Sequence, residues 1–149
     1  MEVLNSSMAN PSGHTNQQVG GPIWNATQHT ATADQIEQGV VDLPEELRQQ
    51  VSRFLTFAEL PGNEDLRIRS IAIVGQLMAA GAKPGDQVML GGAPFFMEEL
   101  SHSCRSVGLI PVFAFSRRES VEQVQEDGSI RKVAIFRHLG FVKPSQPQP

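Results

Sequence analysis

The most restrictive feature of the sequence is a pair of β-rich runs joined by an Asp-Gly dipeptide. The first run covers residues 111–124, the second covers residues 130–138, and Asp127 and Gly128 lie between them. Asp-Gly is typical of a two-residue type I′ turn, in which both central residues have positive φ. The sequence therefore predicts a β-hairpin near the C-terminal end of the chain.

A turn centred on this dipeptide sets a register that brings basic side chains face to face. Arg118 falls opposite Arg137, and Arg117 falls opposite His138. Like charges at opposed positions destabilise a sheet, so we expect these side chains to hold an anion. The alternative is that the two consecutive arginines form ordinary surface salt bridges with neighbouring glutamates.

Composition restricts the class of partner and the compartment. The chain has 149 residues, enough for one domain with its own core, and a net charge of −4. Proteins that bind duplex DNA non-specifically are usually basic, so such binding is not expected. Cys104 is the only cysteine, and we see neither a signal peptide nor a long apolar run. These features predict a soluble cytoplasmic protein with no membrane partner.

Residues 22–143 are expected to form a single α/β domain. Residues 1–21 are rich in Asn, Ser, Gln and Gly, and the tail at residues 144–149 alternates Pro with polar residues. Both segments are expected to be disordered, because they bury too little apolar surface to offset the entropy of ordering.

Strand and helix signals alternate along this domain. Strands are expected at residues 22–27, 87–90 and 110–115. Helices are expected at residues 33–38, from 43 onward, at 63–80 and at 95–107. Thr32 is the expected N-cap of the first of these helices, and Asn63 that of the third. The core residues expected in the longest helix are Leu66, Ile73, Val74, Leu77 and Met78. The unbroken apolar run at 110–115 indicates burial on both faces. The pattern predicts a Rossmann-like fold, with a small, mostly parallel sheet, flanking helices and the C-terminal hairpin.

Polar and glycine residues follow the predicted strands at their carboxyl ends, where open α/β sheets bind ligands. They are Asn25, Thr27, Gln28 and His29 after the first strand, Gly91 and Gly92 after the second, and Ser116, Arg117 and Arg118 after the third, with Arg137 and His138 alongside. This convergence predicts a binding site for a nucleotide or another phosphorylated small ligand.

The glycine pair allows two interpretations. Gly91 and Gly92 precede a predicted helix whose free N–H groups could hold a phosphate, or they form a tight turn. They match neither the dinucleotide-binding fingerprint nor a P-loop, so no cofactor is expected.

The histidines are candidates for proton transfer. His29 and His138 could act as general acid or base, although a lone histidine is more often structural, and His102 is expected to be structural. Histidines and carboxylates lack the spacing of metal ligands, so no metal site is expected.

Several blocks of sequence resemble a family of small, mostly uncharacterised prokaryotic proteins. They are N-A-T-Q-H-T-A-T at residues 25–32, G-G-A-P at 91–94, F-S-R-R-E-S at 115–120 and F-R-H-L-G-F at 136–141. The opening block is more distantly similar to small Rossmann-like CRISPR-associated proteins, among them ring nucleases that cleave cyclic oligoadenylate signals of antiviral defence.

This second resemblance implies a metal-independent phosphodiesterase that acts as a homodimer. It implies that Arg117, Arg118 and Arg137 stabilise the phosphorane, that Gly91 and Gly92 offer N–H groups, and that His29 or His138 is the acid or base. The rival hypothesis is a non-enzymatic protein of phage or plasmid type, which sequesters a nucleotide or blocks a protein partner through its basic rim.

Overall fold

The sheet contains a short interior strand, β1 (Ile23–Ala26), in a computed structural model that describes residues 21–144. Within these residues the sheet has five strands in the order β2-β1-β3-β4-β5. The other strands are β2 (Val40–Asp42), β3 (Gln87–Leu90), β4 (Ile110–Val124) and β5 (Ile130–Val142). The first four run parallel, and β5 runs antiparallel to β4. The chain is therefore a mixed α/β protein with a mostly parallel sheet.

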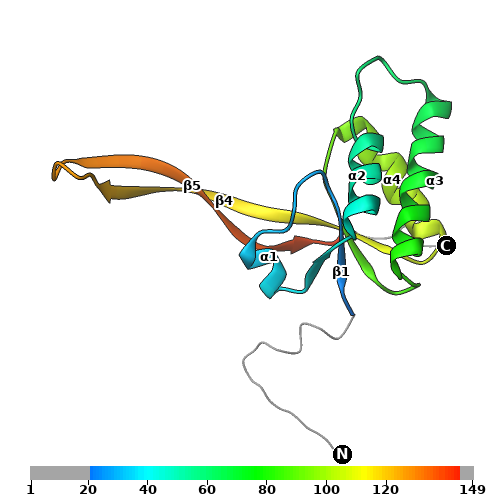
Figure 1. Cartoon of the computed structure of the whole chain (residues 1–149), viewed down its shortest axis with the longest axis horizontal. Coiled ribbons are helices and arrows are strands. Elements are labelled where there is room, and N and C mark those ends of the chain that lie inside the picture. The colour runs from blue at the N-terminus through cyan, green and yellow to red at the C-terminus, as the bar shows by residue number, and fades with distance from the viewer. Residues whose placement is uncertain (1–20, 145–149) are drawn as a thin grey trace, which may run out of the picture.

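The helices cover the two faces of the sheet unequally (Figure 1). The five-residue helix α1 (Ala33–Glu37) lies on one side of β1. On the other side pack α2 (Glu45–Phe54), α3 (Asn63–Ala80) and α4 (Pro94–Ser106). The main core fills the space between these three helices and the sheet, around Phe96. A smaller apolar cluster that includes Met89 lies on the α1 side.

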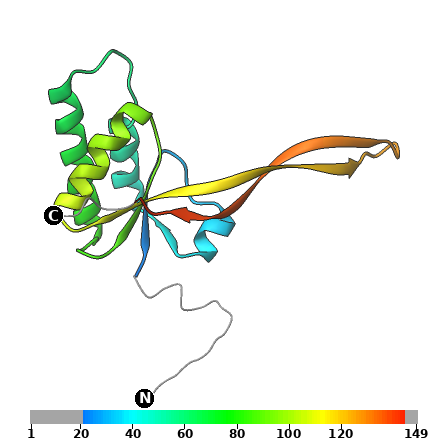
Figure 2. The ribbon, with the colours of Figure 1, turned by 180° about the vertical axis from the view of Figure 1, so that it is seen from behind.

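Beyond the body of the protein, β4 and β5 continue alone as a long twisted ribbon (Figures 1 and 2). The pairing of β4 with β3 ends at Phe113, whereas its pairing with β5 continues to Val124. We call residues 114–141 the arm. The part of the arm nearest the body, residues 114–121 and 133–141, is the foot, and residues 122–132 are the tip.

Most of the predicted elements are confirmed, with shifts of one or two residues at their ends, except that β5 continues four residues beyond the predicted end at residue 138. Thr32 caps α1 with its side chain in a capping box. Gly81 ends α3 with a φ of 115°, a left-handed conformation that favours glycine. The connection from β3 through α4 to β4 is the expected βαβ unit.

Three local predictions are wrong, and one strand was missed. The missed strand is β2, which has only three residues. The N-cap of α3 is Gly62, because Asn63 is already helical. Met78 is 42% exposed, since the core-facing side of α3 runs through Ser70, Ile73 and Leu77 instead. The strand that begins at residue 110 is not buried throughout: Phe115 is 51% exposed, because β4 has left the body by that point.

The predicted register of the hairpin is also wrong, by one residue. Arg117 pairs with Arg137, and Arg118 pairs with Phe136. The turn is a three-residue loop, in which the Gly128 N–H donates to the Gln125 carbonyl and Gly128 has a φ of 86°. This geometry is that of a turn followed by a left-handed glycine, the usual three-residue hairpin loop.

The predictions of disorder at the two ends of the chain fall on residues 1–20 and 145–149, which lie outside the described residues. In the part of the chain from residue 21 to residue 144, none of the helices has the length and apolar character needed to cross a membrane.

Candidate functional site

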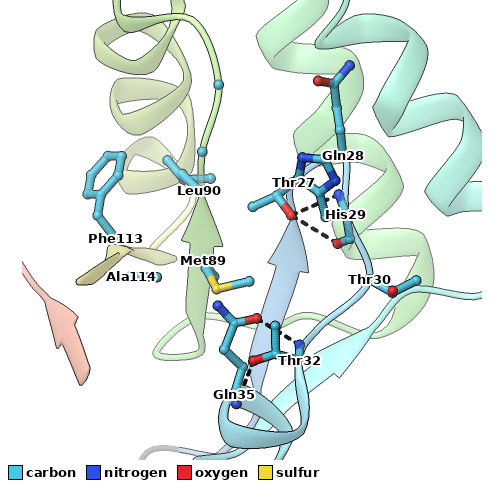
Figure 3. Close-up of a pocket in the computed structure, with 12 residues that line it drawn as sticks. Thr27, Gln28, His29, Thr30, Thr32, Gln35, Met89, Leu90, Phe113 and Ala114 are labelled. Carbon is cyan, nitrogen blue, oxygen red and sulfur yellow. Dashed lines mark hydrogen bonds between the residues drawn. The ribbon is translucent and has the colours of Figure 1, made fainter. Parts of the chain in front are cut away.

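A pocket of about 560 Å³ opens at the carboxyl ends of β1 and β3 (Figure 3). Its polar wall is the loop at residues 27–30, which follows β1. The turn of Gly91 and Gly92 after β3 forms a second wall, and the beginning of α1 forms a third. Phe113 and Ala114 of β4 close it on the remaining side. Residues far apart in the sequence therefore meet at this edge of the sheet.

Asn25 fixes the loop that forms the polar wall. Its side-chain amide donates hydrogen bonds to the His29 carbonyl oxygen at 2.7 Å and to Asp42 Oδ1 at 2.8 Å. Its Oδ1 accepts from Thr27 N at 2.9 Å and from Thr27 Oγ1 at 2.7 Å. Asn25 is only 2% exposed, so it supports the pocket from beneath. The sequence analysis placed Asn25 among the ligand-binding residues, a role that stays a prediction.

Asp42 completes this support, and the sequence analysis did not single it out. Its carboxylate accepts from the Asn25 amide and from the Ala31 N–H at 3.0 Å. The loop after β1 is thus tied to the end of β2, its neighbour in the sheet. The only sign of β2 in the sequence is the apolar pair Val40 and Val41 before Asp42. Two residues are too few to identify a strand by periodicity.

Other side chains of the loop differ in how firmly they are held. Gln28 Nε2 donates to Thr56 Oγ1 at 2.6 Å, which binds the loop to the residues that follow α2. The backbone of His29 is held by Asn25 and Thr27, and the imidazole lies exposed on the wall of the pocket. Of the predicted catalytic residues, His29 is therefore the one that the structure places at the pocket.

The glycine turn is closely packed against the polar wall. A Cβ on Gly91 would lie 3.3 Å from Thr27 Cγ2, and one on Gly92 would lie 3.2 Å from Met97 Cε. The following helix α4 begins at Pro94, and no side chain caps its N-terminus with a hydrogen bond. The turn thus brings backbone close to the pocket where a larger residue would crowd Thr27.

The arginines of the arm do not line this pocket. Arg117 Nη2 and Nε donate to Glu119 Oε2 at 2.6 and 3.0 Å, and Arg137 Nε donates to Glu119 Oε1 at 3.0 Å. The opposed pair therefore already has a counter-ion. Salt bridges with neighbouring glutamates were the alternative to a bound anion in the sequence analysis. Arg118 lies on the opposite face of the ribbon and, among residues 21–144, has no ion pair. Ser116 pairs with His138, also beyond the pocket lining.

His138 binds the foot of the arm to α1. Its Nε2 lies 3.0 Å from Gln38 Oε1, and its ring packs edge-on against Phe141 at 5.0 Å. These contacts give His138 a structural environment. In the described part of the chain, no cluster of three or more His, Cys, Asp or Glu residues could hold a metal ion.

Comparisons with known proteins give a family and no activity. Neither the curated proteins nor the solved structures contain a match to the chain. One family model does match, over residues 21–142, which include the pocket, all five strands and the arm. The sequence analysis expected an uncharacterised family from four blocks between residues 25 and 141, and this expectation is confirmed. The chain belongs to the uncharacterized protein MJ1673 family.

Proposed function

We propose that this protein binds a nucleotide or a closely related phosphorylated small molecule in the pocket at the ends of β1 and β3. The observation that carries the proposal is the position of the pocket in the strand order. From β1 the chain moves outward to β2, and it then returns across β1 to form β3. In Rossmann-like sheets of order 2-1-3-4, ligands bind where the direction of winding changes, at the carboxyl ends of these two strands.

The lining of the pocket suits the two halves of a nucleotide. The loop at residues 27–30 offers hydroxyl, amide and imidazole groups. The glycine turn suits an anionic group, because a ligand can approach the backbone N–H groups of glycines closely. Met89 and Phe113 offer apolar contact for a base. We therefore place the phosphate near Gly91 and Gly92 and the base against β3 and β4.

Binding is better supported than cleavage. A phosphodiesterase reaction needs a group that moves a proton and a group that stabilises the phosphorane. His29 lines the pocket and is our candidate for the first role, but Arg117 and Arg137 are engaged with Glu119. Hydrolysis of a cyclic oligonucleotide is thus a second step that the test below examines separately.

The test is a thermal-shift screen of the purified chain against mononucleotides, cyclic dinucleotides, cyclic oligoadenylates and inorganic phosphate, followed by chromatography of each mixture. A ligand at a hundred times its Kd should stabilise the protein by about 2.7 kcal/mol. An intact ligand after the shift supports a binding protein, and a cleaved one adds the phosphodiesterase step. If none of these compounds raises the melting temperature, the proposal is wrong.

Two exposed alanines provide a matched pair of variants. Ala114 lines the pocket and is exposed, so Ala114→Phe should fill part of the pocket and reduce binding at least tenfold. Ala79, an exposed alanine of α3, lies outside both the pocket and the arm, and Ala79→Phe should bind normally. Equal binding by both variants would place the ligand elsewhere.

A further inference from the structure

One face of the arm exposes large apolar side chains near both of its ends, with polar and small side chains between them. Directly opposed residues of an antiparallel pair point to the same face, and successive pairs alternate. One face therefore carries Arg118, Ser120, Glu122, Val124, Ile130, Lys132, Ala134 and Phe136, and we call it the apolar arm face. Its three large apolar side chains are Val124, Ile130 and Phe136, which are 76%, 64% and 73% exposed.

The other face of the arm is partly closed by its own side chains. It carries Val121, Val133 and Ile135, which are half-buried, beside the ion pairs of Glu119. A two-stranded ribbon is at best marginally stable in water unless a further layer covers it. The apolar arm face is thus the side that lacks its covering layer within residues 21–144.

We propose that this layer is the apolar arm face of a second copy of the chain, with the two arms packed antiparallel about a two-fold axis. The pattern of the face is self-complementary in this direction. Phe136 lies towards the foot, whereas Val124 and Ile130 form the last cross-strand pair at the tip. Antiparallel packing brings Phe136 of each copy onto Val124 and Ile130 of the other, and the symmetry makes this contact twice.

The residues between these two apolar positions interdigitate. The pair Ser120 and Ala134 is small, and the next pair, Glu122 and Lys132, is long. In the antiparallel arrangement the small pair of one arm faces the long pair of the other, which allows the ribbons to approach closely.

Charge along the arm also favours the antiparallel direction. The foot carries three arginines and one glutamate, a net charge of +2. The tip carries Glu122, Glu126 and Asp127 against Arg131 and Lys132, a net charge of −1. Antiparallel packing places each tip beside the opposite foot, where Arg118 is free to meet Glu126 or Asp127 of the other copy.

The first test measures the mass of the full chain in solution by light scattering and sedimentation at micromolar concentrations. We expect a dimer for the natural chain and a monomer for Phe136→Asp. The matched control is Leu60→Asp, which removes a side chain that is 98% exposed on the body and should stay dimeric. A monomeric natural chain overturns the proposal and leaves the face to another partner. A dimer that survives Phe136→Asp overturns it as well.

The second test does not depend on the stability of a charged variant. Cys104 is buried, so engineered cysteines are the only accessible thiols among residues 21–144. Phe136→Cys mixed with Val124→Cys should cross-link into a disulfide dimer, because the two positions face each other. Either variant alone should cross-link far less, since its two copies lie about 20 Å apart, three pairs along the ribbon. Equal cross-linking by a single variant would overturn the antiparallel arrangement.

Discussion

Arg117 and Arg137 lie directly opposite each other on β4 and β5, and the carboxylate of Glu119 accepts hydrogen bonds from both. The repulsion between two opposed arginines is thus removed by a third residue on the same face, two positions along the strand. The arm is built to tolerate this pair without a bound anion.

Glu119 should therefore make the stability of the arm depend on pH. The hydrogen bonds from Arg117 and then from Arg137 hold the pKa of Glu119 below its ordinary value of 4.5. A carboxylate with a lowered pKa stabilises the folded state fully above its ordinary pKa, and this contribution is lost as the pH falls through the lower, folded value. We expect Glu119→Gln to lower the melting temperature at pH 7, and the difference from the natural chain to shrink in acid.

Melting curves between about pH 2.5 and pH 7 measure this effect. Glu59→Gln is the control, because Glu59 is exposed outside the arm and forms no ion pair within residues 21–144. An unchanged difference between Glu119→Gln and the natural chain over this range would show that the two ion pairs do not stabilise the arm.

Replacement of Asn25 by aspartate should destabilise the folded protein. Asn25→Asp keeps the size of the side chain but replaces the donor to Asp42 and to the His29 carbonyl with an acceptor. A buried carboxylate beside Asp42 is then unpaired, at a cost of about 3 kcal/mol. Urea unfolding followed by the fluorescence of Trp24, the only tryptophan, measures this loss. The exposed Gln123→Glu serves as the control, and an equal effect of both changes would contradict the role given to Asn25.

The hydroxyl groups of Ser70 and Ser103 should behave as a coupled pair. Their oxygens lie 2.7 Å apart in the core between α3 and α4, and Ser70 also donates to the Arg67 carbonyl. Ser103 therefore donates to Ser70, so Ser70→Ala leaves a buried donor without its acceptor and should cost about 1–2 kcal/mol. The double variant with Ser103→Ala should cost less than the sum of the single changes. Additive effects in a double-mutant cycle would rule out this coupling.

Cys104 should be inert while the protein is folded. Burial raises the pKa of its thiol to about 12, so the reactive thiolate is scarce at pH 8 and the sulfur is inaccessible. We expect no reaction with a thiol reagent such as dithionitrobenzoate under native conditions, and full reaction in urea. Ala58→Cys, between α2 and α3, supplies an exposed thiol as the comparison. Rapid labelling of the natural chain would mean that α4 opens readily.

The turn of the hairpin shows where local sequence reasoning was sufficient and where it was not. Asp127 and Gly128 predicted the turn, its place in the chain and the two strands around it. They did not define the register, because Asp-Gly fits both a two-residue turn and the end of a three-residue loop. The Asp127 carboxylate accepts from the N–H and hydroxyl groups of Ser129, which stabilises the longer loop. One extra loop residue moved Arg118 to the other face of the ribbon.

The pocket was predicted in part for a topological reason. The ends of parallel strands meet at one edge of a sheet, so the loop after β1 and the glycines after β3 could be placed together from sequence. The path of β4 could not be predicted from sequence, because nothing in residues 110–124 marks the point at which the strand leaves the body. The contributions of Phe113 and Ala114 to the pocket, and the distance of the arginines from it, depend on that point.

The continuity of β4 has a mechanical consequence. Phe113 and Ala114 form a wall of the pocket, and Ala114 is also the first residue of the arm. A change in the angle of the arm would therefore move that wall of the pocket. A partner that holds the arm at one angle also holds Phe113 and Ala114 at one position. If such a partner raises the affinity for a ligand that prefers this position, the ligand must, by linkage, raise the affinity for the partner by the same factor.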